Sequence, residues 1–323
     1  MTDTLWLWGG FTLFVLAMLA LDLGVFNRKA HAVSFKEALT WTGVWVALAM
    51  IFNAGVWHFA GPQKALEFFT GYLIEYSLSA DNVFIFALIF SYFAVPPQWQ
   101  HKVLFWGILG ALVMRVIMIF AGVALISRFG WILYIFGAFL IFTGLKMIFS
   151  KAEEVHPEHN PIVRWFRKLV PVSSGHHDDK LVVRVNGRLM ATPLMVVLVC
   201  VEVTDVIFAV DSIPAIFAVT LDPFIIYTSN VFAIMGLRSL YFVLGGMMGM
   251  FHYLKLGLGC VLTFIGVKML LGHTAWKIDT LVALGVVAVI LASSVIASLV
   301  HARRARARLA ASPEKPNLES DHV

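Results

Sequence analysis

Nine long apolar stretches run through the chain, and they constrain its fold more than any other feature. A helix needs about 20 apolar residues to cross a bilayer. Because unpaired backbone groups are costly in lipid, such stretches cross as helices. We therefore expect an all-α polytopic membrane protein with about nine transmembrane helices. The predicted crossings are residues 5–26, 38–60, 66–95, 103–126, 129–149, 192–220, 224–250, 253–271 and 278–300.

Composition and cysteine usage agree with the membrane class. Of the 323 residues, 60% are hydrophobic and only 13% are charged, whereas soluble domains carry about 25% charged residues. Cys200 and Cys260 both lie in apolar stretches, so neither a disulfide framework nor a zinc site is predicted. The first stretch lacks a basic leader and contains Asp22, so we expect it to be retained as a helix.

Lysine and arginine gather in alternate connections, which predicts the orientation. Short cytoplasmic loops collect positive charge, and the connections after crossings one, three, five, seven and nine hold most of it. We expect an external amino terminus and a cytoplasmic carboxyl terminus, with a basic and polar tail at 301–323. Topology then explains the net charge of +5, and no nucleic-acid partner is predicted.

Residues 150–191 form one long polar connection, which we expect to be cytoplasmic. Asn186-Gly187 separates two short alternating runs and accepts the positive φ of a tight turn, so it predicts a β-hairpin. Thr192-Pro193 then has the cap and first-turn proline of a helix start. Some polar residues here suit either a metal-sensing loop or a solvated linker. They are His156, His159, His176, His177, Asp178 and Asp179.

Part of the chain repeats itself. Residues 129–147 correspond without a gap to 251–269, with glycines and a final Lys-Met pair at the same spacing. Upstream, Arg115 corresponds to Arg238, and the run from Glu75 to Asn82 corresponds to the run from Asp205 to Ser212. Shared acids and arginines are difficult to explain by chance similarity of apolar helices.

The repeating unit is three crossings, over residues 66–149 and 192–271. Because three is an odd number, the second copy enters the membrane from the other side. The sequence therefore predicts an inverted repeat, an arrangement common among secondary transporters.

Acidic residues inside these apolar segments indicate the chemistry. Each unpaired charge costs upwards of about 2.5 kcal/mol in a membrane, and a bound cation would offset that cost. Asn82 and Ser212 each follow an aspartate of the repeat and would add neutral oxygens. The predicted metal-binding residues are Glu75, Asp81, Asn82, Glu202, Asp205, Asp211 and Ser212.

The geometry of these acids leaves alternatives open. Glu75 and Asp81 are separated by about 240° on a straight helix. Either the helix unwinds around 77–79 or the two acids serve different sites, and Pro214 would allow a break in the second copy. Glu202 and Asp205 share a face.

Ion pairing is the alternative to metal binding. Arg115 and Arg238 are also intramembrane, and they would pair with some of the acids. Two arginines cannot neutralise five carboxylates, so one or two acids would be protonated and would carry protons. Oxygen-only ligands favour a hard cation such as Mn²⁺, Mg²⁺ or Ca²⁺ over Zn²⁺ or Cu⁺.

Three motifs of this chain resemble the TerC family of tellurium-resistance-associated membrane proteins, in particular its Alx branch. They are the connection from Leu21 to Ala38, the run from Glu75 to Asn82, and the run from Glu202 to Pro214. The resemblance covers about residues 5–300. It implies a bacterial inner-membrane protein of the LysE-type transporter superfamily, with Mn²⁺ efflux as its activity and Asp22 as an additional acid.

We therefore expect a proton-coupled exporter of a divalent cation, with the lipid bilayer and the metal ion as its partners and with no resident cofactor. The alternative is a membrane scaffold of a metal or tellurite stress-resistance complex. An intramembrane aspartyl hydrolase built on Asp81 and Asp211 is disfavoured, because the glycine-rich signature expected beside such an aspartate is absent. No enzymatic activity is predicted.

Overall fold

The structure is a computed structural model that describes residues 2–21, 34–149, 161–173, 179–185, 187–245, 253–272, 274 and 276–311. Within these residues the chain forms ten helices and one two-stranded sheet. In order, they are α1 (Thr2–Leu21), α2 (Phe35–Ala60), α3 (Pro62–Tyr92), α4 (Pro97–Arg128), α5 (Ile132–Phe149), α6 (Pro161–Leu169), β1 (Val182–Val185), β2 (Arg188–Ala191), α7 (Pro193–Phe217), α8 (Pro223–Gly245), α9 (Leu254–Leu271) and α10 (Thr280–Ala311).

Each of the nine predicted apolar stretches contains one helix, so the all-helical membrane class is confirmed. Within the described part of the chain, seven helices are long and apolar enough to cross a bilayer: α2, α3, α4, α5, α7, α9 and α10. The apolar part of α1 is shorter, at Trp6–Met18. The apolar sequence of α8 is interrupted by the polar run 228–230 and by Arg238, which a helix buried within the protein can accommodate.

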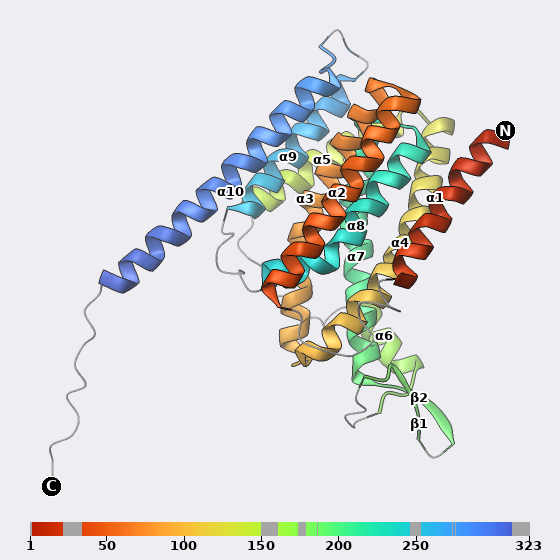
Figure 1. Cartoon of the computed structure of the whole chain (residues 1–323), viewed down its shortest axis with the longest axis vertical. Coiled ribbons are helices and arrows are strands. Elements are labelled where there is room, and N and C mark those ends of the chain that lie inside the picture. The colour runs from red at the N-terminus through yellow and green to blue at the C-terminus, as the bar shows by residue number, and fades with distance from the viewer. Residues whose placement is uncertain are drawn as a thin grey trace.

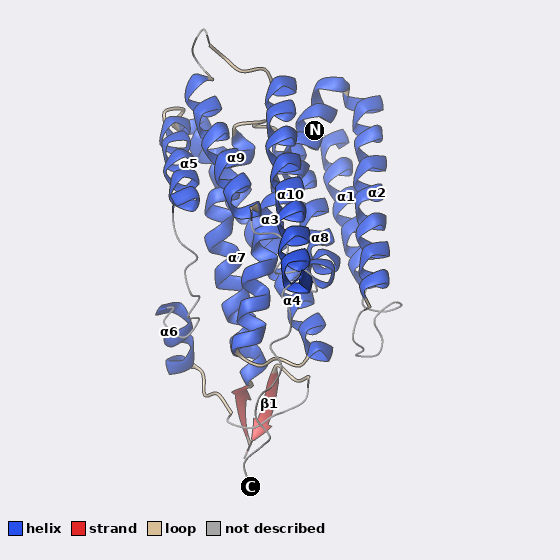
Figure 2. Cartoon of the chain, turned by 90° about the vertical axis from the view of Figure 1, so that its left-hand side faces the viewer, coloured by secondary structure: helices blue, strands red, loops and turns tan. Residues whose placement is uncertain are grey.

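The helices run side by side as one bundle (Figure 1). The start of α1 lies at the end of the bundle opposite the hairpin, and α10 extends past the other helices. α6 and the strands lie together at the hairpin end (Figure 2). α8 is the central helix, since every residue from Ile225 to Tyr241 is buried and α8 packs against α2, α3 and α4.

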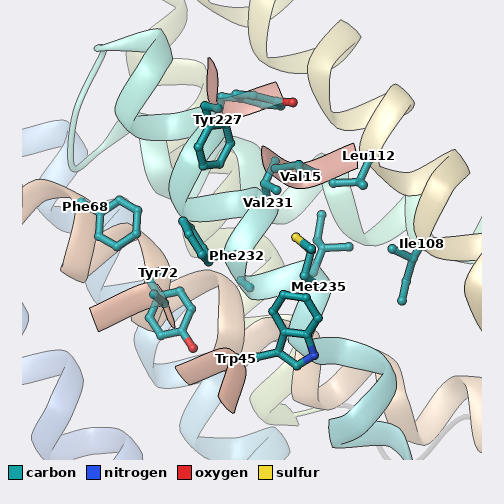
Figure 3. Packing of buried hydrophobic residues seen from close by; sticks show 14 of the residues in the cluster. Val15, Trp45, Phe68, Tyr72, Ile108, Leu112, Tyr227, Val231, Phe232 and Met235 are labelled. Atoms are coloured by element: carbon teal, nitrogen blue, oxygen red, sulfur yellow. The ribbon is translucent and has the colours of Figure 1, made fainter. Parts of the chain in front are cut away.

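An aromatic cluster surrounds Phe232 of α8 (Figure 3). Its ring lies 5.8 Å from that of Phe11, 5.1 Å from Phe52 and 6.1 Å from Phe68, measured between centroids. Tilted and edge-to-face ring pairs at such separations add to the gain from burial. The cluster therefore joins α1, α2 and α3 to the central helix.

The connections show why the elements begin and end where they do. Gly61 has φ = 90° between α2 and α3, a value that L-residues rarely adopt, and Pro62 then opens α3. The Thr192 side chain accepts a hydrogen bond from the amide of Met195 and caps α7. β1 and β2 pair antiparallel around Gly187, which has φ = 79°.

Two helix interruptions that the sequence left open are not observed, and one helix is longer than expected. α3 is continuous through 77–79, and α7 continues through Pro214 before ending at Phe217. Unwinding at 77–79 was therefore wrong, which leaves the alternative that Glu75 and Asp81 serve different sites. α10 continues to Ala311, into the predicted polar tail, since alanine, arginine and leucine are strong helix formers.

α5 and α9 cross at glycines, and their backbones approach closely there. A Cβ atom added to Gly144 would lie 2.6 Å from the Gly259 carbonyl oxygen, and one added to Gly266 would lie 2.6 Å from the Gly137 carbonyl oxygen. Small residues at such crossings allow close packing of membrane helices. This contact therefore requires glycine on both helices.

We predict that Gly144→Ala destabilises the protein by about 1–3 kcal/mol, the usual cost of overpacking, because the new methyl group would push α9 away. The matched control is Gly285→Ala in α10, where a Cβ would meet nothing within 4 Å. It should be neutral or slightly stabilising through helix propensity. Thermal unfolding of the detergent-purified proteins measures both, and equal melting temperatures would contradict the prediction.

Candidate ion-binding site

Arg115 of α4 is the centre of a buried polar cluster. Its side chain is 2% exposed. Nη1 donates to Oε1 of Glu75 on α3 and lies 2.9 Å from the hydroxyl of Ser212 on α7. Nη1 also lies 2.7 Å from Oδ1 of Asn230 on α8, and Nη2 lies 3.9 Å from Oδ1 of Asp205 on α7. One guanidinium therefore joins four helices.

The helical repeat explains which polar side chains share a helix face with Glu75 and Asp205. Residues seven apart lie on almost the same face of a helix, because each residue turns by about 100°. Glu75 and Asn82 are related in this way on α3, and Asp205 and Ser212 on α7; all four are buried. On α7 the second aspartate, Asp211, is six residues from Asp205, so it lies on a different face of the helix.

The cluster is incomplete as an ion-pair network. Oε2 of Glu75 and Oδ2 of Asp205 are buried without a hydrogen-bond partner, and so is the hydroxyl of Ser79. Buried oxygens of this kind usually have partners. If both carboxylates are ionised, the single charge of Arg115 does not balance them. Glu75 and Asp205 therefore supply more oxygen atoms and more negative charge than Arg115 uses.

Glu202 lies one turn before Asp205 on α7, on the side toward the hairpin. Its carboxylate fits against Gly110 of α4, where a Cβ atom would collide with it. A small cavity adjoins Asp205 and is otherwise lined by apolar residues, among them Gly107 and Ala111 of α4. Since α4 and α7 both begin at the hairpin end, Glu202 and this cavity lie between that end and Arg115.

Asp211 is separate from the Arg115 cluster. Its neighbours are Thr143 and Lys146 of α5. Asp81 lies in α3, but its side chain falls outside the described part of the structure, as does all of Asp22. Among the side chains that the structure describes, no three His, Cys, Asp or Glu residues lie together as a metal site.

Arg238 also lies apart from the four-helix cluster. It borders a small pocket together with Glu37 and Trp41 of α2 and His101 of α4. The correspondence between Arg115 and Arg238 in the sequence therefore does not extend to their surroundings. Arg115 contacts the membrane acids of α3 and α7, whereas Arg238 lies beside the first turn of α2.

Asp179 is the one described member of the polar residues considered for metal sensing. It forms an ion pair of 2.7 Å with Lys102 at the start of α4. The hydrogen bond from Lys102 holds the pKa of Asp179 below its ordinary value. His156, His159, His176, His177 and Asp178 lie outside the described residues.

Two residues of the site were missed from the sequence. Asn230 completes the contacts of Arg115, and its Nδ2 donates to the Ile226 carbonyl, which turns Oδ1 toward the guanidinium. The polar run 228–230 inside an apolar helix was an available signal. Gly110 was also missed, and only the packing of α4 on α7 shows its role.

The chain is similar to several known proteins, all of them described as membrane proteins. The family model described as "Integral membrane protein TerC family" matches residues 60–306. An uncharacterized membrane protein of Myxococcus xanthus is 54% identical over 93% of each chain. A Salmonella typhi protein named "Putative membrane-bound redox modulator Alx" is 52% identical over 87% of this chain and 90% of its own. No solved structure matches.

We predict that Arg115→Met sharply lowers the amount of folded protein in the membrane. Removing one partner of a buried ion pair costs about 3–5 kcal/mol, because Glu75 and Asp205 would remain without a counter-charge. Arg128→Met, at the exposed end of the same helix, is the control and should accumulate normally. Adding Glu75→Gln and Asp205→Asn to Arg115→Met should restore most of the protein.

Size-exclusion chromatography of the membrane extract measures the folded fraction of each variant. Normal accumulation of Arg115→Met by itself, or no recovery in the triple variant, would show that the charge balance of this cluster is not what holds the four helices.

Proposed function

Since the chain belongs to the TerC family of integral membrane proteins, as its motifs indicated, we propose that it is a secondary transporter that exports a divalent metal cation. Among these cations, we propose Mn²⁺ as the cargo. One observation carries the proposal: among the side chains that the structure describes, Glu75 and Asp205 are buried with one positive partner, Arg115. Charged groups inside membrane segments are costly and usually mark an ion pathway.

The ligand atoms of this cluster favour a hard cation. Glu75 and Asp205 offer carboxylate oxygens, and Ser212 and Asn230 offer neutral oxygens. Such donors suit Mn²⁺, Mg²⁺ and Ca²⁺ better than Zn²⁺ or Cu⁺, which favour imidazole and thiolate. Negative oxygens also bind an oxyanion such as tellurite poorly. Within the hard cations, Mn²⁺ is the choice that the family resemblance implies.

We propose further that the two halves form an inverted repeat. In the α5–α9 crossing, Gly137 lies against Gly266, and Gly144 lies against Gly259. The sequence correspondence pairs Gly137 with Gly259 and Gly144 with Gly266, so a two-fold axis would exchange these two contacts. Inverted repeats of this kind support alternating access in many secondary transporters.

The proposed orientation places the hairpin end in the cytoplasm. The amino terminus lies at the opposite end of the bundle (Figure 1), which agrees with the distribution of lysine and arginine. Glu202 and the cavity beside Asp205 would then lie on the cytoplasmic side of Arg115. This is where an exporter would receive its cargo.

Energy must come from a gradient, because the sequence has no phosphate-binding loop. Moving a divalent cation out against an inside-negative potential costs about 4.6 kcal/mol per 100 mV, twice the value for one charge. We propose proton antiport, in which Glu202 or Asp205 alternately binds a proton and the metal. Two protons exchanged for one Mn²⁺ would make the cycle electroneutral.

A membrane scaffold for a stress-resistance complex is the second candidate. The observation that favours it is α6, where Trp165 and Leu169 are exposed beside Arg164 and Lys168. A partner could dock on this surface. The scaffold predicts that deleting residues 155–178 abolishes function while substitutions of the buried acids spare it; the exporter predicts the reverse.

Metal flux from purified protein in liposomes tests the proposed activity. We expect Mn²⁺ to move and tellurite not to move. Glu75→Gln and Asp205→Asn should each reduce Mn²⁺ flux at least about tenfold, because each removes half of the carboxylate charge. Asp81→Asn and Asp211→Asn should likewise abolish Mn²⁺ flux, with little loss of folded protein in the membrane.

Asp279→Asn is the matched control, since Asp279 is exposed and its Oδ1 accepts a hydrogen bond from the Leu281 amide at the start of α10. Asparagine can accept the same hydrogen bond. The flux of this variant should equal that of the wild type. Movement of tellurite without Mn²⁺ would refute the ligand argument.

Imposed gradients test the coupling. With the transporter in vesicles, an inward proton gradient should accelerate Mn²⁺ efflux and drive it against its own concentration gradient. Mn²⁺ release that does not change with the imposed pH and voltage gradients, and that follows only the Mn²⁺ concentration gradient, would exclude antiport. Facilitated diffusion of Mn²⁺ would then be the remaining mechanism.

A further inference from the structure

The guanidinium of Arg115 occupies the place that a cation between Glu75 and Asp205 would take. It is held by the two carboxylates from α3 and α7, and its own Nε is buried without a partner. Arg115 itself comes from α4 and is almost fully buried. A positive group attached to the protein therefore fills the space between the two carboxylates.

The charges make Arg115 and a divalent cation mutually exclusive at this site. Two ionised carboxylates match one divalent cation. With Arg115 also in place, the three protein groups and the cation would sum to a positive charge in a water-poor interior, where repulsion between like charges is strong. The cation can therefore take both carboxylates only if the guanidinium leaves them.

Arg115 retains other partners when it gives up the carboxylates. Oδ1 of Asn230 lies 2.7 Å and Oγ of Ser212 lies 2.9 Å from Nη1. Both are neutral oxygens on α7 and α8. A small displacement toward them would keep the guanidinium hydrogen-bonded, so release of the acids does not require complete desolvation of a free charge.

Resting on the proposed export of a divalent cation, we infer that Arg115 is a positioning residue that competes with the cargo for Glu75 and Asp205. In the empty protein it closes the site by pairing with both acids. The cargo, reaching Asp205 past Glu202, displaces it. Replacement of the guanidinium by the metal ion then couples metal binding to a rearrangement of α3, α4 and α7.

Equilibrium binding and flux of Mn²⁺ should respond in opposite directions when Arg115 is changed. The probe is Mn²⁺ alone, titrated calorimetrically into the full-length protein in detergent and moved by the same protein in liposomes. Arg115→Gln should bind Mn²⁺ at least about tenfold more tightly. In the wild type, the apparent affinity for Mn²⁺ is reduced to the fraction of protein in which Arg115 does not occupy the site. The flux of Arg115→Gln should fall at least about tenfold, because the empty site can no longer close.

Arg115→Lys keeps the charge but loses the planar fork that contacts several oxygens at once. It should bind Mn²⁺ more tightly than the wild type and less tightly than Arg115→Gln. If Arg115→Gln yields no monodisperse protein, Arg115→Lys decides the question. Arg128→Gln, exposed at the end of α4, should change neither measurement.

The outcomes separate this inference from the function on which it rests. A wild type that transports Mn²⁺, with position-115 variants that bind it equally or more weakly, overturns the competition and leaves the exporter intact. That result would indicate a purely structural role for Arg115. A wild type that neither binds nor moves Mn²⁺ overturns the proposed function and this inference together.

Discussion

Placing charged groups inside an apolar bundle is the constraint on which the rest of this structure depends. Arg115, Glu75 and Asp205 are each less than 5% exposed, and lipid cannot solvate them. They are stable only while α3, α4 and α7 hold them against one another and Asn230 of α8 completes the contacts. The positions of four helices are thus tied to one guanidinium.

The remaining packing serves to keep those helices in place by two different means. On one side, the rings around Phe232 fill the space between α8 and the helices α1, α2 and α3. On the other, glycines let α5 and α9 approach backbone to backbone. Large aromatic side chains in one region and glycines in the other both produce close packing. Neither group offers a polar partner to the buried acids.

The same arrangement fits the proposed transport better than a purely structural role for the cluster. A structural ion-pair network would satisfy its oxygens, whereas here Oε2 of Glu75 and Oδ2 of Asp205 have no partner. Buried ion pairs are seldom more stabilising than apolar packing of the same volume. Retaining an unbalanced one in a bilayer is reasonable if its charge is used by a moving ion.

The sequence alone determined the membrane class, the nine helical segments and the hairpin turn at Gly187, because lipid and backbone sterics act locally on residue type. It also indicated the acids, since a charge in an apolar stretch is visible without a structure. Only the tertiary structure decided how they group: Glu75 with Asp205 at Arg115, Asp211 near Lys146, and Arg238 elsewhere. This grouping depends on which helix faces pack against each other. Apolar helices have several similar faces, so the local sequence pattern does not indicate which of them will meet.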